Sequence, residues 1–169
     1  LFIFLNIINN IILQYIKMEL FRYQTKEEAR GKAVEELNKL FSEIQGPIFF
    51  LSSGGSSFEV LEEIEIGYLA GRVTLGMLDE RYSVDPKVNN FSQLFQTQFF
   101  QKAKKQGISY IDTSVQKGES LGQLAKRFEK DFRTWKEKNQ SGKVIITQGV
   151  GSDVNTAGIL PYPENPELF

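Results

Sequence analysis

Three short apolar runs, each followed at once by small or charged residues, set the strongest limit on the fold of this chain. PIFFL at 47–51 leads into SSGGSS at 52–57, VTLGML at 73–78 leads into DERY at 79–82, and VIIT at 144–147 leads into a glycine-rich segment. Apolar runs of this length with helical segments between them are typical of parallel strands. The sequence therefore predicts a doubly wound α/β fold, with a mostly parallel sheet and helices on both faces.

Helical periodicity fills the intervals between the apolar runs. The segment 25–44 opens with a capping box, Thr25 followed by Glu28, and carries one apolar stripe. The expected elements are a strand at 20–23, helices at 25–44, 56–64, 91–106 and 119–138, and a weaker strand at 108–111. The buried side of the last helix is expected to carry Leu121, Leu124, Phe128, Phe132 and Trp135.

The first seventeen residues differ from the rest of the chain. Residues 1–17 are apolar, but amide side chains interrupt them, and the run is short for a membrane span. They also lack the basic region and the small-residue cleavage site of a signal peptide. We interpret them as a non-native upstream extension, with a membrane anchor as the alternative, and residues 18–169 as one α/β domain. About twenty residues follow Gly149, so we expect a sheet that is incomplete at its C-terminus.

Composition excludes several kinds of site. The chain contains no cysteine and no histidine, so it offers neither thiolate nor imidazole ligands and no cysteine nucleophile. We therefore expect no metal and no cofactor. The formal net charge is −1 and no basic stripe is present, which argues against nucleic acid as a partner. The expectation is a cytoplasmic protein that acts on a small molecule and is not bound to a membrane.

The polar segments that follow the strands form the candidate site. In a parallel α/β sheet, ligands bind outside the carboxyl ends of the strands, where these segments would meet. Gly54 and Gly55 would let backbone N–H groups approach an anion, and Ser56 and Ser57 would add hydroxyl donors. The alternative is a plain turn between strand and helix that needs glycine for its geometry.

Four segments resemble the 6-phosphogluconolactonase family in order and spacing. They are SGGSS at 53–57, LDERYSV at 78–84, NNF at 89–91 and GVGSDVNTAGILP at 149–161. That family shares its fold with the glucosamine-6-phosphate isomerases. The resemblance implies hydrolysis of 6-phosphogluconolactone to 6-phosphogluconate, a step of the pentose phosphate pathway. Two alternatives stay open, a sugar-phosphate isomerase of the glucosamine-6-phosphate type and a catalytically silent protein that binds sugar phosphates.

The same segments suggest which residues carry the function. Arg81 would neutralise the oxyanion of a lactone carbonyl or hold the phosphate, and Asp79 would orient Arg81 or bind sugar hydroxyls. The alternative for this pair is a solvated salt-bridge cluster. The expected catalytic residues are Asp79, Arg81, Asp153 and Asn155. The expected substrate-binding and phosphate-binding residues are Ser53, Gly54, Gly55, Ser56, Ser57, Asn90, Gly151 and Thr156.

Asn155 stands where the resembled family carries its motif histidine, and Val154 stands where it carries glycine. An amide can orient a water molecule, but it cannot take a proton from it. Loss of a positioned general base typically costs about a hundred- to ten-thousandfold in rate. Asp153 or Asp79 would have to serve instead, and a carboxylate with a pKa of about 4 is a weak base at neutral pH unless burial raises that pKa. Reduced lactonase activity is therefore expected.

Overall fold

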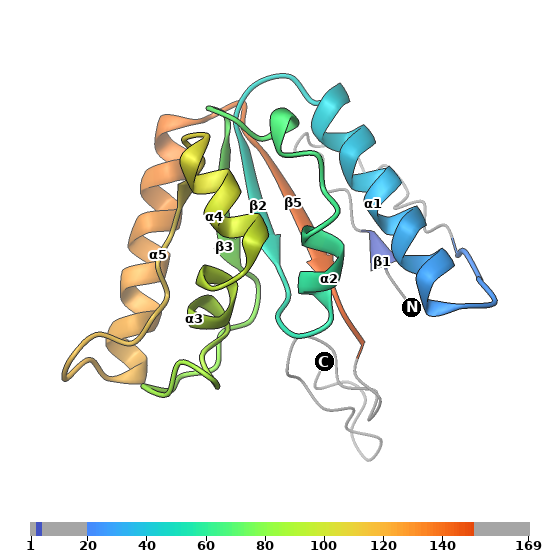
Figure 1. The fold of residues 1–169 in the computed structure, drawn as a ribbon. Helices are drawn as coiled ribbons and strands as arrows, with labels where there is room; N and C mark the ends of the chain where they lie inside the picture. Colours follow the sequence, from blue (N-terminus) through green and yellow to red (C-terminus); the bar gives the residue numbers. More distant parts are fainter. Residues whose placement is uncertain (1–2, 5–19, 151–169) are drawn as a thin grey trace, which may run out of the picture.

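A computed structural model describes residues 3–4 and 20–150 of the 169-residue chain, with side chains over 20–150. Five strands form one sheet in the order β1-β5-β2-β3-β4 (Figure 1). Neighbours among β2, β3, β4 and β5 run parallel, and β1 pairs with β5 in the antiparallel direction. The strands are β1 (Ile3–Phe4), β2 (Ile48–Ser52), β3 (Val73–Met77), β4 (Ser109–Tyr110) and β5 (Lys143–Gln148). The predicted α/β fold with a mostly parallel sheet is confirmed.

Helices cover both faces of this sheet. They are α1 (Lys26–Glu43), α2 (Ser57–Leu61), α3 (Asn90–Phe95), α4 (Gln98–Lys105) and α5 (Leu121–Lys138), with a 3-10 turn η1 at Ile66–Tyr68. Side chains from α1 to α4 share one hydrophobic cluster with one face of the sheet. Side chains from α5 pack on the opposite face. Figure 1 shows α5 and α1 on opposite sides of the strands. The expectation of helices on both faces is confirmed.

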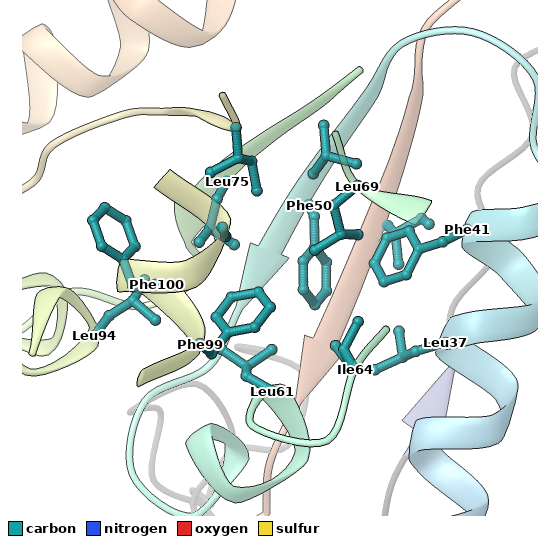
Figure 2. Close-up of a cluster of buried hydrophobic side chains, with 14 of the residues drawn as sticks. Leu37, Phe41, Phe50, Leu61, Ile64, Leu69, Leu75, Leu94, Phe99 and Phe100 are labelled. Atoms are coloured by element: carbon teal, nitrogen blue, oxygen red, sulfur yellow. The ribbon is translucent and has the colours of Figure 1, made fainter. Parts of the chain in front are cut away.

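The alternation of side chains along β2 divides the core in two. Ile48 and Phe50 face the α1 side, where Phe50 packs edge-on against Phe41 of α1 at a ring distance of 5.2 Å (Figure 2). Phe49 faces the other side and meets Phe132 and Trp135 of α5, each at 5.1 Å. All three strand residues are fully buried, so β2 contributes to the hydrophobic core on both faces of the sheet.

The start of α1 forms as predicted, with one change. The Thr25 hydroxyl accepts a hydrogen bond from the backbone N–H of Glu28 at 3.1 Å. The Glu28 carboxylate reaches back to the N–H of Gln24 at 3.0 Å, one residue before the cap. The reciprocal bond of the expected capping box is therefore displaced by one residue, and it still removes a free donor at the helix start.

Three local predictions are wrong. Residues 20–23 form no strand, and Ile3–Phe4 is the segment that pairs with the outer edge of β5. The helix expected over 91–106 is two helices, because Thr97 is the N-cap of a second helix that begins at Gln98, and Glu62 accepts from the first two amides of that helix, α4. Leu121 is 60% exposed rather than buried, since α5 begins at that residue.

No helix in residues 20–150 combines the length and the apolar character that a membrane span requires.

Candidate functional site

Four loops leave the carboxyl ends of the parallel strands at the same edge of the sheet. Residues 53–56 follow β2, residues 78–82 follow β3, residues 111–119 follow β4, and Gly149 follows β5. Hydrogen bonds join these loops to one another and to the N-terminus of α3. This edge is the candidate functional site. The hydrogen bonds there show which side chains are used to hold the loops and which are left to bind a ligand.

Ser53 fastens the end of β2 to the end of β5. Its hydroxyl donates to the carbonyl of Thr147 at 2.8 Å and accepts from the N–H of Gly149 at 3.2 Å. Its own N–H also donates to the Thr147 carbonyl at 3.2 Å. Because the side chain is buried and its hydroxyl is engaged in both directions, Ser53 holds the loop rather than a ligand.

Gly54 is required because the Asn90 side chain lies directly against it. A Cβ atom added at Gly54 would sit 2.5 Å from Asn90 Oδ1, closer than any real Cβ contact. The Asn90 side chain in turn donates to the carbonyl of Asp79 at 2.9 Å. Asn90 is 2% exposed, so it joins the β2 loop and the β3 loop from inside. For Gly54, the structural alternative of a sterically required glycine therefore accounts for the residue.

The remaining residues of the glycine loop are more open. Gly55 has a φ of 64°, the left-handed conformation that favours glycine, and open space surrounds the position of its missing Cβ. Ser56 is exposed and makes no side-chain cap to α2. Ser57 is buried, and its hydroxyl lies 3.7 Å from the position of a Cβ at Gly149. The accessible part of the predicted phosphate loop is therefore Gly55–Ser56.

Glu80 is the most heavily bonded side chain at this edge. Its carboxylate accepts from the N–H groups of Arg81 at 2.8 Å, Asn90 at 2.6 Å and Phe91 at 3.1 Å. The Thr113 hydroxyl donates to the same carboxylate. Burial raises the pKa of Glu80, while the bonds from Thr113, Asn90, Phe91 and Arg81 oppose that rise. Glu80 was not among the predicted site residues.

Glu80 also closes the N-terminus of α3 to other anions. It takes the amides of Asn90 and Phe91, and the Asn89 side chain takes the amide of Ser92 at 2.8 Å. The next amide, that of Gln93, donates to the Asn89 carbonyl within the helix. Every amide in the first turn of α3 therefore has a partner, so a phosphate would have to be held elsewhere.

Asp79 and Arg81 flank Glu80 in sequence and differ from it in their bonding. Asp79 Oδ1 is buried and has no hydrogen-bond partner among the described residues, and the same holds for Thr147 Oγ1 at the end of β5. The Arg81 side chain is exposed, and it makes no ion pair within residues 20–150. Buried polar atoms without partners are costly, which marks Asp79 as a group that could take a donor from a ligand or a water molecule.

The loop from β4 to α5 is held to the site by Arg127. Its guanidinium forms two bonds to the Glu119 carboxylate, at 2.8 and 2.9 Å, and donates to the carbonyls of Asp112 and Ser114. The Tyr82 hydroxyl donates to the Glu119 carbonyl. This ion pair keeps the pKa of Glu119 low, at about 2.

We expect Arg127→Met to remove a contribution to stability that is present at neutral pH and is lost in acid. The pKa of Glu119 falls from 4.5 to about 2 in the folded chain, so its contribution is present above pH 4.5 and is lost as pH falls toward 2. The difference in melting temperature between the wild type and Arg127→Met should therefore shrink as the pH is lowered through this window. Glu80, whose pKa is raised, has the opposite pH dependence, but it is common to both proteins.

Arg133→Met is the matched control, because Arg133 pairs with Glu129 on the exposed side of the same helix. Its melting temperature should stay close to that of the wild type at every pH, as is usual for exposed pairs. A difference for Arg127→Met that does not change with pH would contradict the assigned role of Glu119.

A cavity of about 570 Å³ adjoins the glycine loop. It lies between the first half of α1 and residues 21–25, and its lining includes Tyr23, Lys26 and Lys32. Ser56 and Gly149 also line it, whereas Asp79 and Arg81 do not. The volume is within the range of small-molecule sites, roughly 300–1,000 Å³.

The predicted residues of the last motif, Gly151, Asp153, Asn155 and Thr156, lie outside the described residues. Of the others, the structure brings Gly54, Asn90 and Asp79 together, while Ser53 contacts Thr147 and Gly149. Within residues 20–150 no group of three or more Asp or Glu side chains could hold a metal ion.

Sequence reasoning missed Glu80, Thr113, Glu119 and Arg127. A motif match draws attention to groups that would face a ligand, whereas these residues face other parts of the same chain.

Fold and site together define an α/β protein with a polar loop site at the carboxyl edge of its sheet. Comparison with known proteins gives no match: no protein-family model, no curated protein and no solved structure matches the chain. The likeness to the 6-phosphogluconolactonase family therefore rests on the four sequence segments alone.

Proposed function

We propose that this chain binds a sugar phosphate at the carboxyl edge of its sheet and hydrolyses 6-phosphogluconolactone there. The observation that carries the proposal is the arrangement of Asp79 and Arg81 on either side of the bonded Glu80. Asp79 contributes a buried carboxylate oxygen that has no partner among residues 20–150, and Arg81 contributes an exposed cation. The sequence likeness to the lactonase segments supports the choice of substrate.

The contacts assign each group a role in this proposal. Glu80 and Asn89 occupy the amides of α3, so we assign the phosphate to Arg81 and to the open Gly55–Ser56 turn. Asp79 Oδ1 accepts a hydrogen bond from a sugar hydroxyl or from the attacking water. The cavity beside Ser56 provides space for part of the ligand.

The reaction adds water to the lactone carbonyl carbon and breaks the bond from that carbon to the ring oxygen. One proton of the water passes to a base, and the ring oxygen leaves as a hydroxyl after it takes up a proton. Asp79, or Asp153 in the last motif, is the proposed base, and Asn155 orients the water without taking its proton. In the alternative placement, Arg81 stabilises the negative charge on the carbonyl oxygen, and the Gly55–Ser56 turn alone holds the phosphate.

Asn155 favours one second candidate, a protein that binds sugar phosphates without catalysis. The isomerase alternative has no support of its own in the described residues. The proposal places the protein in the cytoplasm with a sugar phosphate, rather than a nucleic acid, as its partner.

The test is calorimetric titration of the 169-residue chain with 6-phosphogluconate, together with the rate of lactone hydrolysis above the spontaneous rate. Arg81→Ala is expected to weaken binding by about 10- to 150-fold, because a hydrogen bond to a charged group contributes about 1.5–3 kcal/mol. Lys87→Ala is the control, since it removes one exposed cation from the same loop.

Three results can be distinguished. Binding with hydrolysis above background supports the lactonase. Binding with the background rate supports the silent sugar-phosphate-binding protein. No binding by a folded wild type, or equal binding by Arg81→Ala, contradicts the proposed site.

A further inference from the structure

Glu80 joins three separate parts of the site with one carboxylate. It follows β3, its Oε1 and Oε2 atoms accept from the first two amides of α3, and the Thr113 hydroxyl from the loop after β4 reaches Oε2. The N–H of Arg81, the next residue, closes back onto Oε1. Both oxygens are thus engaged by the protein, so Glu80 has no free lone pair directed to a ligand and is not the acid or base of the reaction.

The same capping arrangement occurs a second time, away from the site. Glu62 accepts from the first two amides of α4, those of Gln98 and Phe99, each at 2.9 Å. Thr97 caps the third amide of α4, as Asn89 caps the third amide of α3. Glu62 is exposed, and it is joined to no site loop by a hydrogen bond among residues 20–150. Both residues therefore cap a helix. An effect on the site that Glu80 has and Glu62 lacks must come from the position of Glu80 between Asp79 and Arg81.

The bonds around Glu80 restrict the backbone of the residues on either side of it, Asp79 and Arg81. Asn90 is bonded twice to the loop, since its N–H donates to Glu80 and its side chain donates to the Asp79 carbonyl. The Asn89 side chain donates to the carbonyls of Arg81 at 3.4 Å and Thr113 at 3.2 Å. The backbone on both sides of Glu80 is therefore tied to α3.

We propose that Glu80 is a positioning residue, which orders the segment 79–82 against α3 and against the loop after β4. In this arrangement Asp79 and Arg81 can bind the same ligand. The ligand part of this proposal rests on the function proposed above. Its structural part, the ordering of 79–82 by Glu80, does not.

The decisive comparison is Glu80→Gln against Glu62→Gln. Both changes keep the size of the side chain and remove one charged acceptor from a helix start, so both should lower the melting temperature. Amide hydrogen exchange should differ between them. Glu80→Gln should speed exchange at Asn90 and Phe91 and also across 79–82, whereas Glu62→Gln should speed exchange at Gln98 and Phe99 alone.

Binding of 6-phosphogluconate should also differ between the two variants. Glu80→Gln is expected to weaken it by about tenfold or more, because small displacements of binding groups are costly. Glu62→Gln should stay within about twofold of the wild type. If Glu80→Gln does not fold, Thr113→Val removes one donor to the carboxylate and should raise exchange across 79–82 to a lesser extent.

Wild-type exchange across 79–82 in a folded Glu80→Gln would overturn the proposal, whatever the ligand result. Increased exchange with unchanged affinity would also overturn it, because order at Glu80 would then not matter to binding. If the wild type binds no 6-phosphogluconate, the proposed function fails, and the exchange pattern still decides whether Glu80 orders the segment.

Discussion

Replacement of Phe49 by alanine should lower the free energy of unfolding by about 3–5 kcal/mol, the range for a large aromatic side chain lost from a core. Phe49 is fully buried, and its ring makes edge contacts with Phe132 and Trp135 of α5. Within residues 20–150, α5 alone covers this face of the sheet. Since domains are stable by about 5–15 kcal/mol, the change would remove a large share of the total.

Urea unfolding followed by tryptophan fluorescence suits the test, because Trp135 lies in the same cluster and the chain has one tryptophan. Val84→Ala is the control: Val84 is 83% exposed, so its loss should change the free energy of unfolding by less than about 0.5 kcal/mol. A loss below about 1 kcal/mol for Phe49→Ala would mean that α5 does not depend on this contact.

Gly54→Ala is expected to cost about 1–3 kcal/mol of stability and to disrupt the site, although it adds one methyl group. The new Cβ would lie 2.5 Å from Oδ1 and 2.6 Å from Cγ of Asn90. Asn90 would have to move, and its bond to the Asp79 carbonyl would be lost with it. Affinity for 6-phosphogluconate should fall together with the free energy of unfolding, measured in urea.

Two companion variants make the cause specific. Gly55→Ala meets no atom within 4 Å, so it should cost only the strain of a φ of 64°, about 1 kcal/mol. Asn90→Ala should be destabilising in the wild type, yet it should remove much of the additional cost of Gly54→Ala. Additive effects in the double variant would show that contact with Asn90 is not the reason for glycine at position 54.

Local patterns were sufficient for the strands of the central sheet. The runs at 47–51, 73–78 and 144–147 are short, apolar and bounded by turn residues, so they were predicted within one or two residues of β2, β3 and β5. The start of α1 followed from Thr25 and Glu28 for the same reason, since the residues that decide a helix start lie within one turn of it.

The errors occur where a distant residue decides a local structure. The break between α3 and α4 depends on Glu62, which lies 36 positions before the amide it caps. The outer edge of β5 pairs with Ile3–Phe4, more than 140 positions earlier in the chain, and not with residues 20–23. Glu80 could not be recognised as a link between loops, because its partner Thr113 lies 33 positions further along the chain. Periodicity within one segment contains no information about such pairings.

The central place of β2 has a consequence for the order in which the chain can fold. One neighbour, β3, follows β2 closely in the sequence, while the other, β5, is the last of the strands that the structure describes. The bond from Ser53 to Thr147 joins residues 94 positions apart. A chain emerging from the ribosome can complete α1, β2 and β3 early, but one edge of β2 has no partner until β5 has been made. Contacts of such long range slow folding, and the open edge with the uncovered Phe49 ring would be the most vulnerable surface during synthesis.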